Sequence, residues 1–287
     1  MPSVLEDAVL RSPRLRPRTK ELYCEGIRAW LSFAGADPRM WTAARVEDFR
    51  DELVRQGQKT STINLKLRTL SYAAQRWAKR AGTQNFALGV ELLREDKPER
   101  APLSDEEMDR LTASCIGDQI VDLRNYALVV MFVRTGVRRG GLHKLNRDDI
   151  GSDRRIQIIL KGGRPHSFIL DDQTHEALQV WLACLHQHGI TSGAVFRRIR
   201  KNRIGDRMSP FQVWHVVSEA AKHAKIRHVF PHLLRHTLVT VLREDGATPL
   251  EVSGLTGQSE ETIMRTYTHH RPTHAVALAN RLRRLPE

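Results

Sequence analysis

The sequence predicts a mainly α-helical protein with a small antiparallel β-sheet, divided into two domains. Apolar residues recur at helical spacing through most of residues 18–80, whereas residues 155–170 show the alternation typical of strands. Residues 94–102 are charged, contain a proline and have no apolar periodicity, which indicates a linker. We therefore expect a helical N-terminal domain over 1–93 and a second domain over 103–287.

The N-terminal domain is expected to consist of helices alone. Helices are predicted over 18–34 and 45–56, and a third begins after Thr60-Ser61. One stripe of the third helix is apolar and its other faces are cationic, so one side packs while another can meet a polyanion. The candidate DNA contacts on this helix are Lys66, Arg68 and Arg76, and a solvated charged face is the alternative interpretation of each.

The second domain combines helices with one predicted hairpin. The apolar stretch 120–133 indicates a buried core helix. Ile156, Ile158 and Leu160 alternate with less apolar positions, and after a glycine-containing turn the apolar segment Phe168-Ile169-Leu170 follows. This order predicts a β-hairpin with Lys161 at its tip. A helix over 173–188 and a short strand at Val195-Phe196 are expected to follow.

Capping signals mark several helix ends in this domain. Three pairs have the spacing of a capping box, in which a side chain at the helix start and one three residues on bond each other's backbone. These pairs are Ser104 with Glu107, Ser209 with Gln212, and Thr248 with Glu251. Gly246 and Gly257 lie where C-terminal caps belong.

The composition favours a nucleic-acid partner. The chain has 287 residues and a formal net charge of +13, with the excess of basic residues spread over both domains. Nucleic acid ranks ahead of a membrane because no amphipathic lysine-rich helix dominates, and a basic protein without such a partner is the alternative. No signal-peptide core or membrane-spanning apolar run occurs, so we expect a cytoplasmic, nucleoid-associated protein. The cysteines have no metal-ligand spacing and are expected to be reduced packing residues: Cys24, Cys115 and Cys184.

Four residues form a candidate catalytic set: Arg138, His232, Arg235 and Tyr267. His232 and Arg235 are three apart at the start of a helix, so they share a face. Two guanidiniums can clamp the nonbridging oxygens of a phosphodiester, the tyrosine phenol can attack its phosphorus, and the histidine can exchange the proton. Each residue alone has an ordinary structural explanation, but their linked order favours a site.

Several segments in this order resemble the tyrosine recombinase (phage integrase) family, particularly its compact Xer-like members. The segments that carry the resemblance are Thr135-Gly136-Val137-Arg138, the turn Lys161-Gly162-Gly163-Arg164, Pro231-His232-Leu233-Leu234-Arg235-His236, Leu255-Thr256-Gly257-Gln258-Ser259, and Tyr267-Thr268-His269. The helix after Thr60 resembles the core-binding helix of the family's SAM-like N-terminal domain. The resemblance extends over nearly the whole chain.

The resemblance implies a two-domain clamp around double-stranded DNA and a site in which Lys161 is the general acid for the leaving 5′ oxygen. Tyr267 would form a 3′-phosphotyrosyl bond, and a homotetramer would exchange strands between two DNA sites, without metal or another cofactor. A loop facing DNA is implied at the second basic cluster, for which a solvated loop is the alternative. The candidate contacts there are Arg197, Arg198, Arg200, Lys201 and Arg203.

Two positions depart from the family pattern. Gln258 stands where the family usually has histidine and sometimes tryptophan, and its amide can donate a hydrogen bond but carries no proton at neutral pH. Gly141 replaces an acidic residue common three positions after the first arginine, and this change is expected to loosen the site. A non-catalytic DNA-binding relative and a type IB topoisomerase-like relaxing enzyme therefore remain alternatives to a recombinase.

Overall fold

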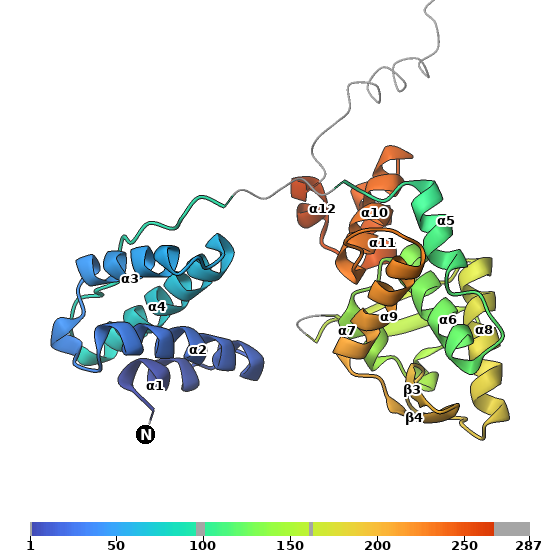
Figure 1. The fold of residues 1–287 in the computed structure, drawn as a ribbon, viewed down its shortest axis with the longest axis horizontal. Coiled ribbons are helices and arrows are strands. Elements are labelled where there is room, and N and C mark those ends of the chain that lie inside the picture. Colours follow the sequence, from blue (N-terminus) through green and yellow to red (C-terminus); the bar gives the residue numbers. More distant parts are fainter. Residues whose placement is uncertain (1, 96–100, 161–162, 267–287) are drawn as a thin grey trace, which may run out of the picture. The chain divides into compact units, whose positions relative to one another are not determined.

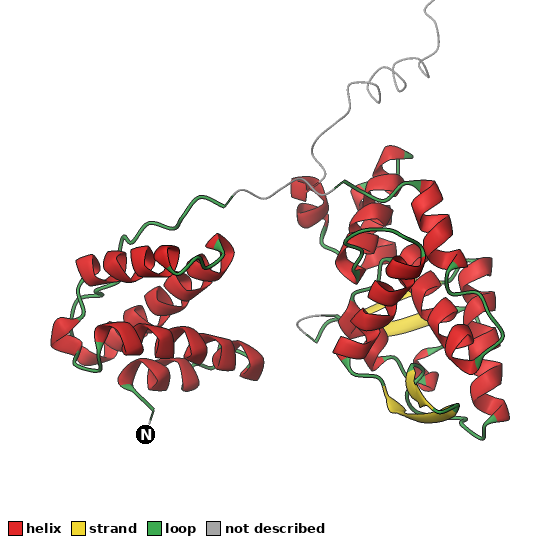
Figure 2. Cartoon of the chain, in the orientation of Figure 1, coloured by secondary structure: helices red, strands yellow, loops and turns green. Residues whose placement is uncertain are grey.

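The chain folds into two compact units, Met1–Glu99 and Arg100–Glu287. In this computed structural model, residues 2–95, 101–160 and 163–266 are described (Figure 1). Helices dominate both units and the strands lie in the second (Figure 2), which confirms the predicted fold class. Within the described ranges, we find no helix with the length and apolarity needed to span a bilayer.

The first unit is helical, as predicted. Its elements are α1 (Val4–Leu10), α2 (Pro17–Ala34), the 3-10 helix η1 (Pro38–Met40), α3 (Ala43–Arg55) and α4 (Thr60–Ala81). The core centres on Trp30, which is fully buried. Its ring meets Phe49 edge-on at 5.4 Å and stacks on Phe86 at 5.8 Å, contacts that add to the burial energy. The sequence predicted α2, α3 and α4 and missed α1.

The second unit is built around one buried helix. Its helices are α5 (Asp105–Ala113), α6 (Ile120–Thr135), α7 (Arg139–Lys144), η2 (Arg147–Asp149), α8 (Asp172–Gln187), α9 (Pro210–His223), α10 (Pro231–Glu244), α11 (Pro249–Thr256) and α12 (Glu260–Thr266). Helix α6, the predicted core helix, packs against α5, α8, α9 and α10. Its Met131 and Phe132 are completely buried. This helix fixes the positions of the elements that carry the candidate site.

Two antiparallel hairpins complete this unit. Strand β1 (Arg155–Ile159) pairs with β2 (Pro165–Ile169), as predicted, with Ile156 opposite Phe168 in the core. Strand β3 (Arg197–Arg200) pairs with β4 (Arg203–Arg207). The second hairpin corrects two expectations, a strand at Val195-Phe196 and a loop over the basic cluster. Charged side chains on both strands hide the alternation of buried and exposed residues that signals a strand.

The predicted helix ends agree with the structure. All three capping boxes form, starting at Ser104, Ser209 and Thr248. Helix α11 ends at Gly257, whose φ of 66° lies in the left-handed region that glycine adopts without strain. Gly246 directly follows the C-terminal cap of α10, with φ of 93°. The three cysteines are free and buried.

Candidate active site

Arg235 is the best-defined member of the candidate set. Its residue is only 2% exposed. Its Nη1 donates to the carbonyl oxygens of Gly136 at 2.7 Å and Thr256 at 2.8 Å, and its Nε donates to Gln258 Oε1 at 3.1 Å. Backbone and side-chain acceptors therefore fix the guanidinium before any substrate arrives, as electrostatic catalysis requires.

The ends of two helices create this position. Gly136 caps the C-terminus of α6 and Gly257 caps that of α11, each in the left-handed conformation. Carbonyls at helix C-termini lack intrahelical partners and carry partial negative charge, so they attract a guanidinium. A Cβ on Gly136 would lie 3.0 Å from Leu238 Cδ2, so the turn needs glycine for close packing as well as conformation. The local sequence Thr-Gly at both helix ends thus explains where Arg235 is held.

Gln258 belongs to the same site. It is 8% exposed. A guanidinium can only donate, so the amide atom facing Arg235 Nε must be the oxygen. Its Nε2 makes no hydrogen bond to any described residue and keeps its donor capacity for a ligand. The amide can therefore hold Arg235 with one end and donate to a phosphate oxygen with the other.

Arg138 and His232 lie beside this centre on different elements. Arg138 is the N-cap of α7, two residues after the Gly136 carbonyl that holds Arg235, and its residue is exposed. Partial burial of its guanidinium lowers the pKa of Arg138, and the nearby charge of Arg164 lowers it further. His232 is exposed in the first turn of α10, one turn before Arg235. The structure thus brings four predicted residues into one region: Arg138, His232, Arg235 and Gln258.

The structure adds His166 and Arg164, which sequence reasoning missed as site residues. His166 on β2 places its Nε2 3.4 Å from the carbonyl oxygen of Leu255, in the last turn of α11. Desolvation is the main cause that lowers the pKa of His166, opposed by this hydrogen bond, and the charges of Arg235, Arg164 and Arg138 lower it further. Strand parity could have identified His166, since it shares the face of buried Phe168.

Two predicted catalytic residues, Lys161 and Tyr267, lie outside the described residues. The structure describes Leu160 and Gly163 on either side of the segment that contains Lys161, and helix α12 before Tyr267. Ser259 precedes α12 and its Oγ accepts from the backbone N–H of Thr262 at 3.4 Å, as an N-terminal cap does. The roles of both residues stay predictions.

Gly141, the second departure from the family pattern, is closely packed. It is buried on α7, and a Cβ there would lie 2.9 Å from Val137 Cγ2 and 3.4 Å from Ile158 Cδ1. The short, branched valine cannot easily move aside. Hydrocarbon groups therefore surround the position at which the resemblance led us to expect an acidic residue, and the effect of the missing carboxylate on the neighbouring basic groups stays a prediction.

Adjacent glycines on α7 provide a test of this packing. We expect Gly141→Ala to lower the free energy of unfolding by about 1 kcal/mol, because overpacking outweighs the gain in helix propensity. Gly140 has open space around its Cβ position, so Gly140→Ala should raise stability by about 0.5 kcal/mol. Urea denaturation of both variants measures the difference, and equal effects would contradict the packing account.

Some side chains of the predicted basic cluster bond other parts of the described chain, and others do not. Arg197 is an anchor, since it donates to the carbonyls of Ala194, Gly205 and Ser192 at 2.9, 3.3 and 3.1 Å. Arg198 forms an ion pair with Asp206 at 2.6 Å. The cations at the tip of this hairpin are exposed and have no polar partner among the described residues: Arg200, Lys201 and Arg203.

The predicted cations of α4 have different surroundings. Lys66 donates to Gln58 Oε1 at 2.8 Å, and burial lowers the pKa of Lys66. Arg76 donates to the Ala8 carbonyl of α1 at 3.1 Å, so part of its guanidinium holds two helices together. Arg68 is exposed, with a carboxylate oxygen of Glu95 at 3.8 Å. Among these three, Arg68 is the most accessible to a polyanion.

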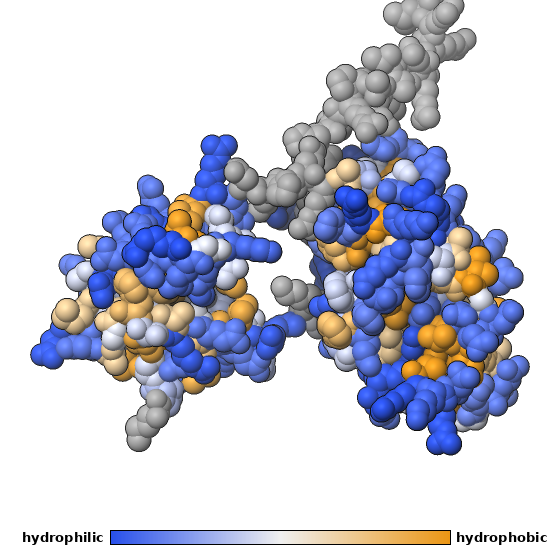
Figure 3. Space-filling view, viewed as in Figure 1, coloured by the Kyte–Doolittle hydropathy of each residue, from blue (hydrophilic) through white to orange (hydrophobic). Residues whose placement is uncertain are grey.

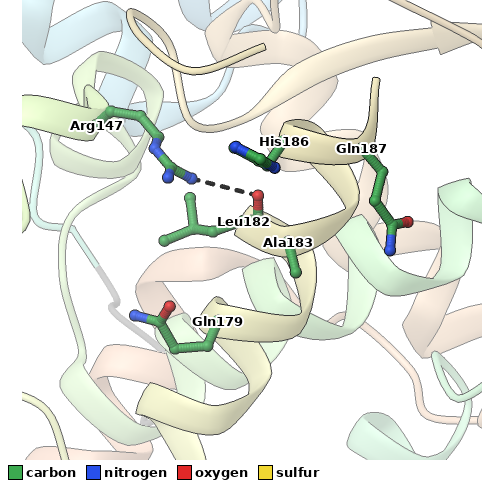
Figure 4. Close-up of a pocket in the computed structure, with 6 residues that line it drawn as sticks. All are labelled: Arg147, Gln179, Leu182, Ala183, His186 and Gln187. Atoms are coloured by element: carbon green, nitrogen blue, oxygen red, sulfur yellow. Dashed lines mark hydrogen bonds between the residues drawn. The ribbon is translucent and has the colours of Figure 1, made fainter. Parts of the chain in front are cut away.

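A separate hollow of about 310 Å³ lies over α8 and η2. Figure 4 shows Arg147 pointing across it, with Nη1 donating to the Leu182 carbonyl at 3.3 Å, and His186 at its edge. None of the predicted site residues lines it. The arginine site therefore remains the candidate functional site. The visible face of each unit is mainly hydrophilic with scattered apolar patches (Figure 3).

The fold agrees with the one that the resemblance to tyrosine recombinases implies. A mainly helical unit holds a buried arginine against two helix ends, with a second arginine and a histidine beside it. Residues 102–274 match the model of the phage integrase family. That match covers more than half of the chain, and the chain belongs to this family.

Curated relatives and solved structures agree with this assignment. Tyrosine recombinase XerC of Corynebacterium glutamicum is 32% identical over 148 residues, covering 51% of this chain and 47% of the relative. XerC of Pseudomonas fluorescens is 24% identical over 279 residues, covering 94% and 92%. The Tn1549 transposon integrase, solved in complex with transposon right end DNA, matches with a TM-score of 0.78 at 16% identity, covering 97% and 98%. At that identity the structural match supports the fold alone.

Proposed function

We propose that this chain is a site-specific DNA recombinase that cleaves and rejoins strands through a 3′-phosphotyrosyl bond to Tyr267. The observation that carries the proposal is the fixed guanidinium of Arg235, held by two helix-end carbonyls and Gln258. Family membership and the order of motifs ending at Tyr267 support it. The Tn1549 integrase, which shares the fold and was solved with transposon right end DNA, supports DNA as the partner.

In the proposed reaction, the nonbridging oxygens of one phosphodiester accept hydrogen bonds from Arg138, Arg235 and the Gln258 amide. His232 accepts the phenol proton of Tyr267 as the phenol oxygen bonds to phosphorus. The bond from phosphorus to the 5′ oxygen breaks, and Lys161 protonates that oxygen. Attack by a 5′-hydroxyl from a partner strand reverses these steps, so the energy of the phosphodiester is retained in the covalent link.

The second hairpin supplies a DNA contact in this proposal. Arg200 lies directly opposite Arg203 in the β3–β4 register, and like charges in such a pair repel. Lys201 and Asn202 form the turn between them with φ of 48° and 56°, as in a type I′ hairpin. Phosphates placed across the tip relieve this repulsion, which favours a polyanion as its partner.

The remaining parts of the proposal follow the family resemblance. Residues 1–93 form a core-binding domain in which Arg68 contacts DNA, 94–102 form the linker, and 103–287 form the catalytic domain. Four copies act on two DNA sites.

The side chain of Asn64 bonds the Leu93 backbone and Glu95 Oε1, so the first residues of this linker are attached to α4.

Trapping with a nicked suicide duplex tests the proposal. Cleavage beside a nick releases a short strand that diffuses away, so rejoining fails and a covalent adduct should accumulate on a denaturing gel. The duplex must contain the target sequence, which can be selected from DNA flanking the gene. No adduct on a bound duplex would favour a non-catalytic DNA-binding protein. Relaxation of a supercoiled plasmid that lacks the target would favour a topoisomerase.

Gln258 offers a second test of the phosphate site. In Gln258→Glu the carboxylate still accepts from Arg235 Nε but repels a phosphate and has no donor, so cleavage should fall about 100-fold. Gln258→His can still accept or donate and should retain or raise cleavage. Gln212→Glu is the matched control, since glutamate suits its capping-box position equally well. Rapid cleavage by Gln258→Glu in the trapping assay would contradict a role for the amide at phosphate.

A further inference from the structure

His166 contacts the turn at the C-terminal end of α11, the same turn that binds Arg235. The Leu255 carbonyl accepts from His166, and the next residue, Thr256, accepts from Arg235 Nη1 at 2.8 Å. A Cβ on Gly257 would lie 2.9 Å from His166 Cδ2, so the imidazole packs directly on this glycine. Gln258 follows and bonds Arg235. One turn of backbone thus joins His166 of β2 to Arg235 of α10.

The geometry fixes the tautomer of the neutral ring. A carbonyl oxygen only accepts, so Nε2 carries the hydrogen that points to Leu255. Nδ1 is then the unprotonated nitrogen, and it makes no hydrogen bond to the described residues. The half-buried ring borders a hollow of about 520 Å³ between β2 and α11, which gives it access to solvent. A proton can therefore be added at Nδ1 without breaking the bond to α11.

We propose that His166 is a proton-carrying residue of the phosphate site, which takes up a proton at Nδ1 when a DNA phosphodiester binds the arginines. The inference rests on the proposed function and deepens it. It assigns a titratable group to a site in which the Gln258 amide cannot change its charge. His166 acts here as a positioning residue, through the α11 turn that holds Arg235 and Gln258.

Charges around His166 explain why binding and protonation are coupled. Arg235 on α10, Arg164 before β2 and Arg138 at the start of α7 all lower the pKa of His166, after the larger effect of desolvation. The Leu255 carbonyl at the end of α11 opposes them, and Glu260 of α12 lines the same hollow. A bound phosphodiester offsets the guanidinium charges, so the pKa of His166 rises on binding.

The linkage has a definite sign. The pKa of free His166 lies below the ordinary value of about 6.5. If binding raises this pKa, the complex holds more protons than the free protein at the pH values between the two. DNA affinity should then strengthen as pH falls through this window, by about threefold per pH unit if about half a proton is taken up.

Calorimetry of the full chain with a short duplex that contains the target sequence measures this uptake. Titrations in two buffers with different ionisation enthalpies, at one pH near 6.5, give the number of protons taken up on binding. Wild type should take up about half a proton more than His166→Gln, in which the amide can still donate to Leu255 but cannot titrate. His166→Arg, permanently charged, should bind without this uptake and serves if the glutamine variant fails to fold.

His186→Gln provides the matched control. His186 lies on α8 at the hollow shown in Figure 4 and has no part in the proposed site, so this variant should keep the wild-type uptake. Equal uptake by wild type, His166→Gln and His166→Arg would overturn the inference while leaving the recombinase proposal intact. Failure of the wild-type chain to bind the duplex would instead contradict the proposed function itself.

Discussion

Replacing Tyr267 with phenylalanine should abolish the covalent adduct with a nicked duplex and leave DNA binding unchanged. The substitution removes the phenol oxygen, the proposed nucleophile, and retains the ring. The contacts assigned to DNA lie on other residues, chiefly Arg138, Arg235 and the tip of the β3–β4 hairpin. A denaturing gel measures the adduct, and a mobility-shift assay with the same duplex measures binding.

Tyr126→Phe is the matched control for this substitution. Tyr126 is a partly buried residue of α6 that packs against the core of the same unit, and the change again removes one phenol oxygen. This variant should form the adduct at the wild-type rate. An adduct formed by Tyr267→Phe, or its loss in Tyr126→Phe alone, would contradict the assignment of the nucleophile.

Arg235→Lys should reduce cleavage about 1,000-fold although the positive charge is retained. An ammonium group is a compact donor and cannot reproduce the planar fork that reaches Gly136, Thr256 and Gln258 together. The carbonyls at the ends of α6 and α11 then lose part of their hydrogen bonding. We expect the free energy of unfolding to fall by about 2 kcal/mol, the scale of a lost hydrogen bond to a charged group.

Cleavage rates from single-turnover trapping and thermal melting test the two effects of Arg235→Lys together. Arg134→Lys is the matched control, because Arg134 is an exposed residue whose contact with Asp171 is 3.4 Å long. Such surface pairs contribute little, so this variant should cleave and melt as wild type does. Wild-type cleavage by Arg235→Lys would show that the fork geometry is not needed at the phosphate.

Local signals in the sequence predicted most helices. The capping boxes at Ser104, Ser209 and Thr248 place helix starts because the two bonding partners are only three residues apart. Helix α1 was missed although Ser3 and Glu6 form the same box. With only seven residues, it is too short to show a clear apolar period, and contacts with α2 and α4 supply its stability.

The sequence identified residues of the arginine site but predicted only part of its geometry. The motifs identified Arg138, Arg235 and Gln258, yet no local pattern shows that Arg235 bonds the last carbonyls of two separate helices. The role of His166 likewise depends on the packing of β2 against α11, which are far apart along the chain. Contacts of this kind join residues that are far apart in the sequence, so local propensity and motif spacing do not predict them.

Peptide mass spectrometry of the trapped adduct tests the central claim most directly. After digestion of both protein and DNA, one peptide should carry the remaining nucleotide through a phosphodiester to its tyrosine. The account predicts that this residue is Tyr267, within Arg265-Thr266-Tyr267-Thr268-His269, with phosphate at the 3′ end of the cleaved strand. A nucleotide attached to any other residue, or to a 5′ phosphate, would contradict it.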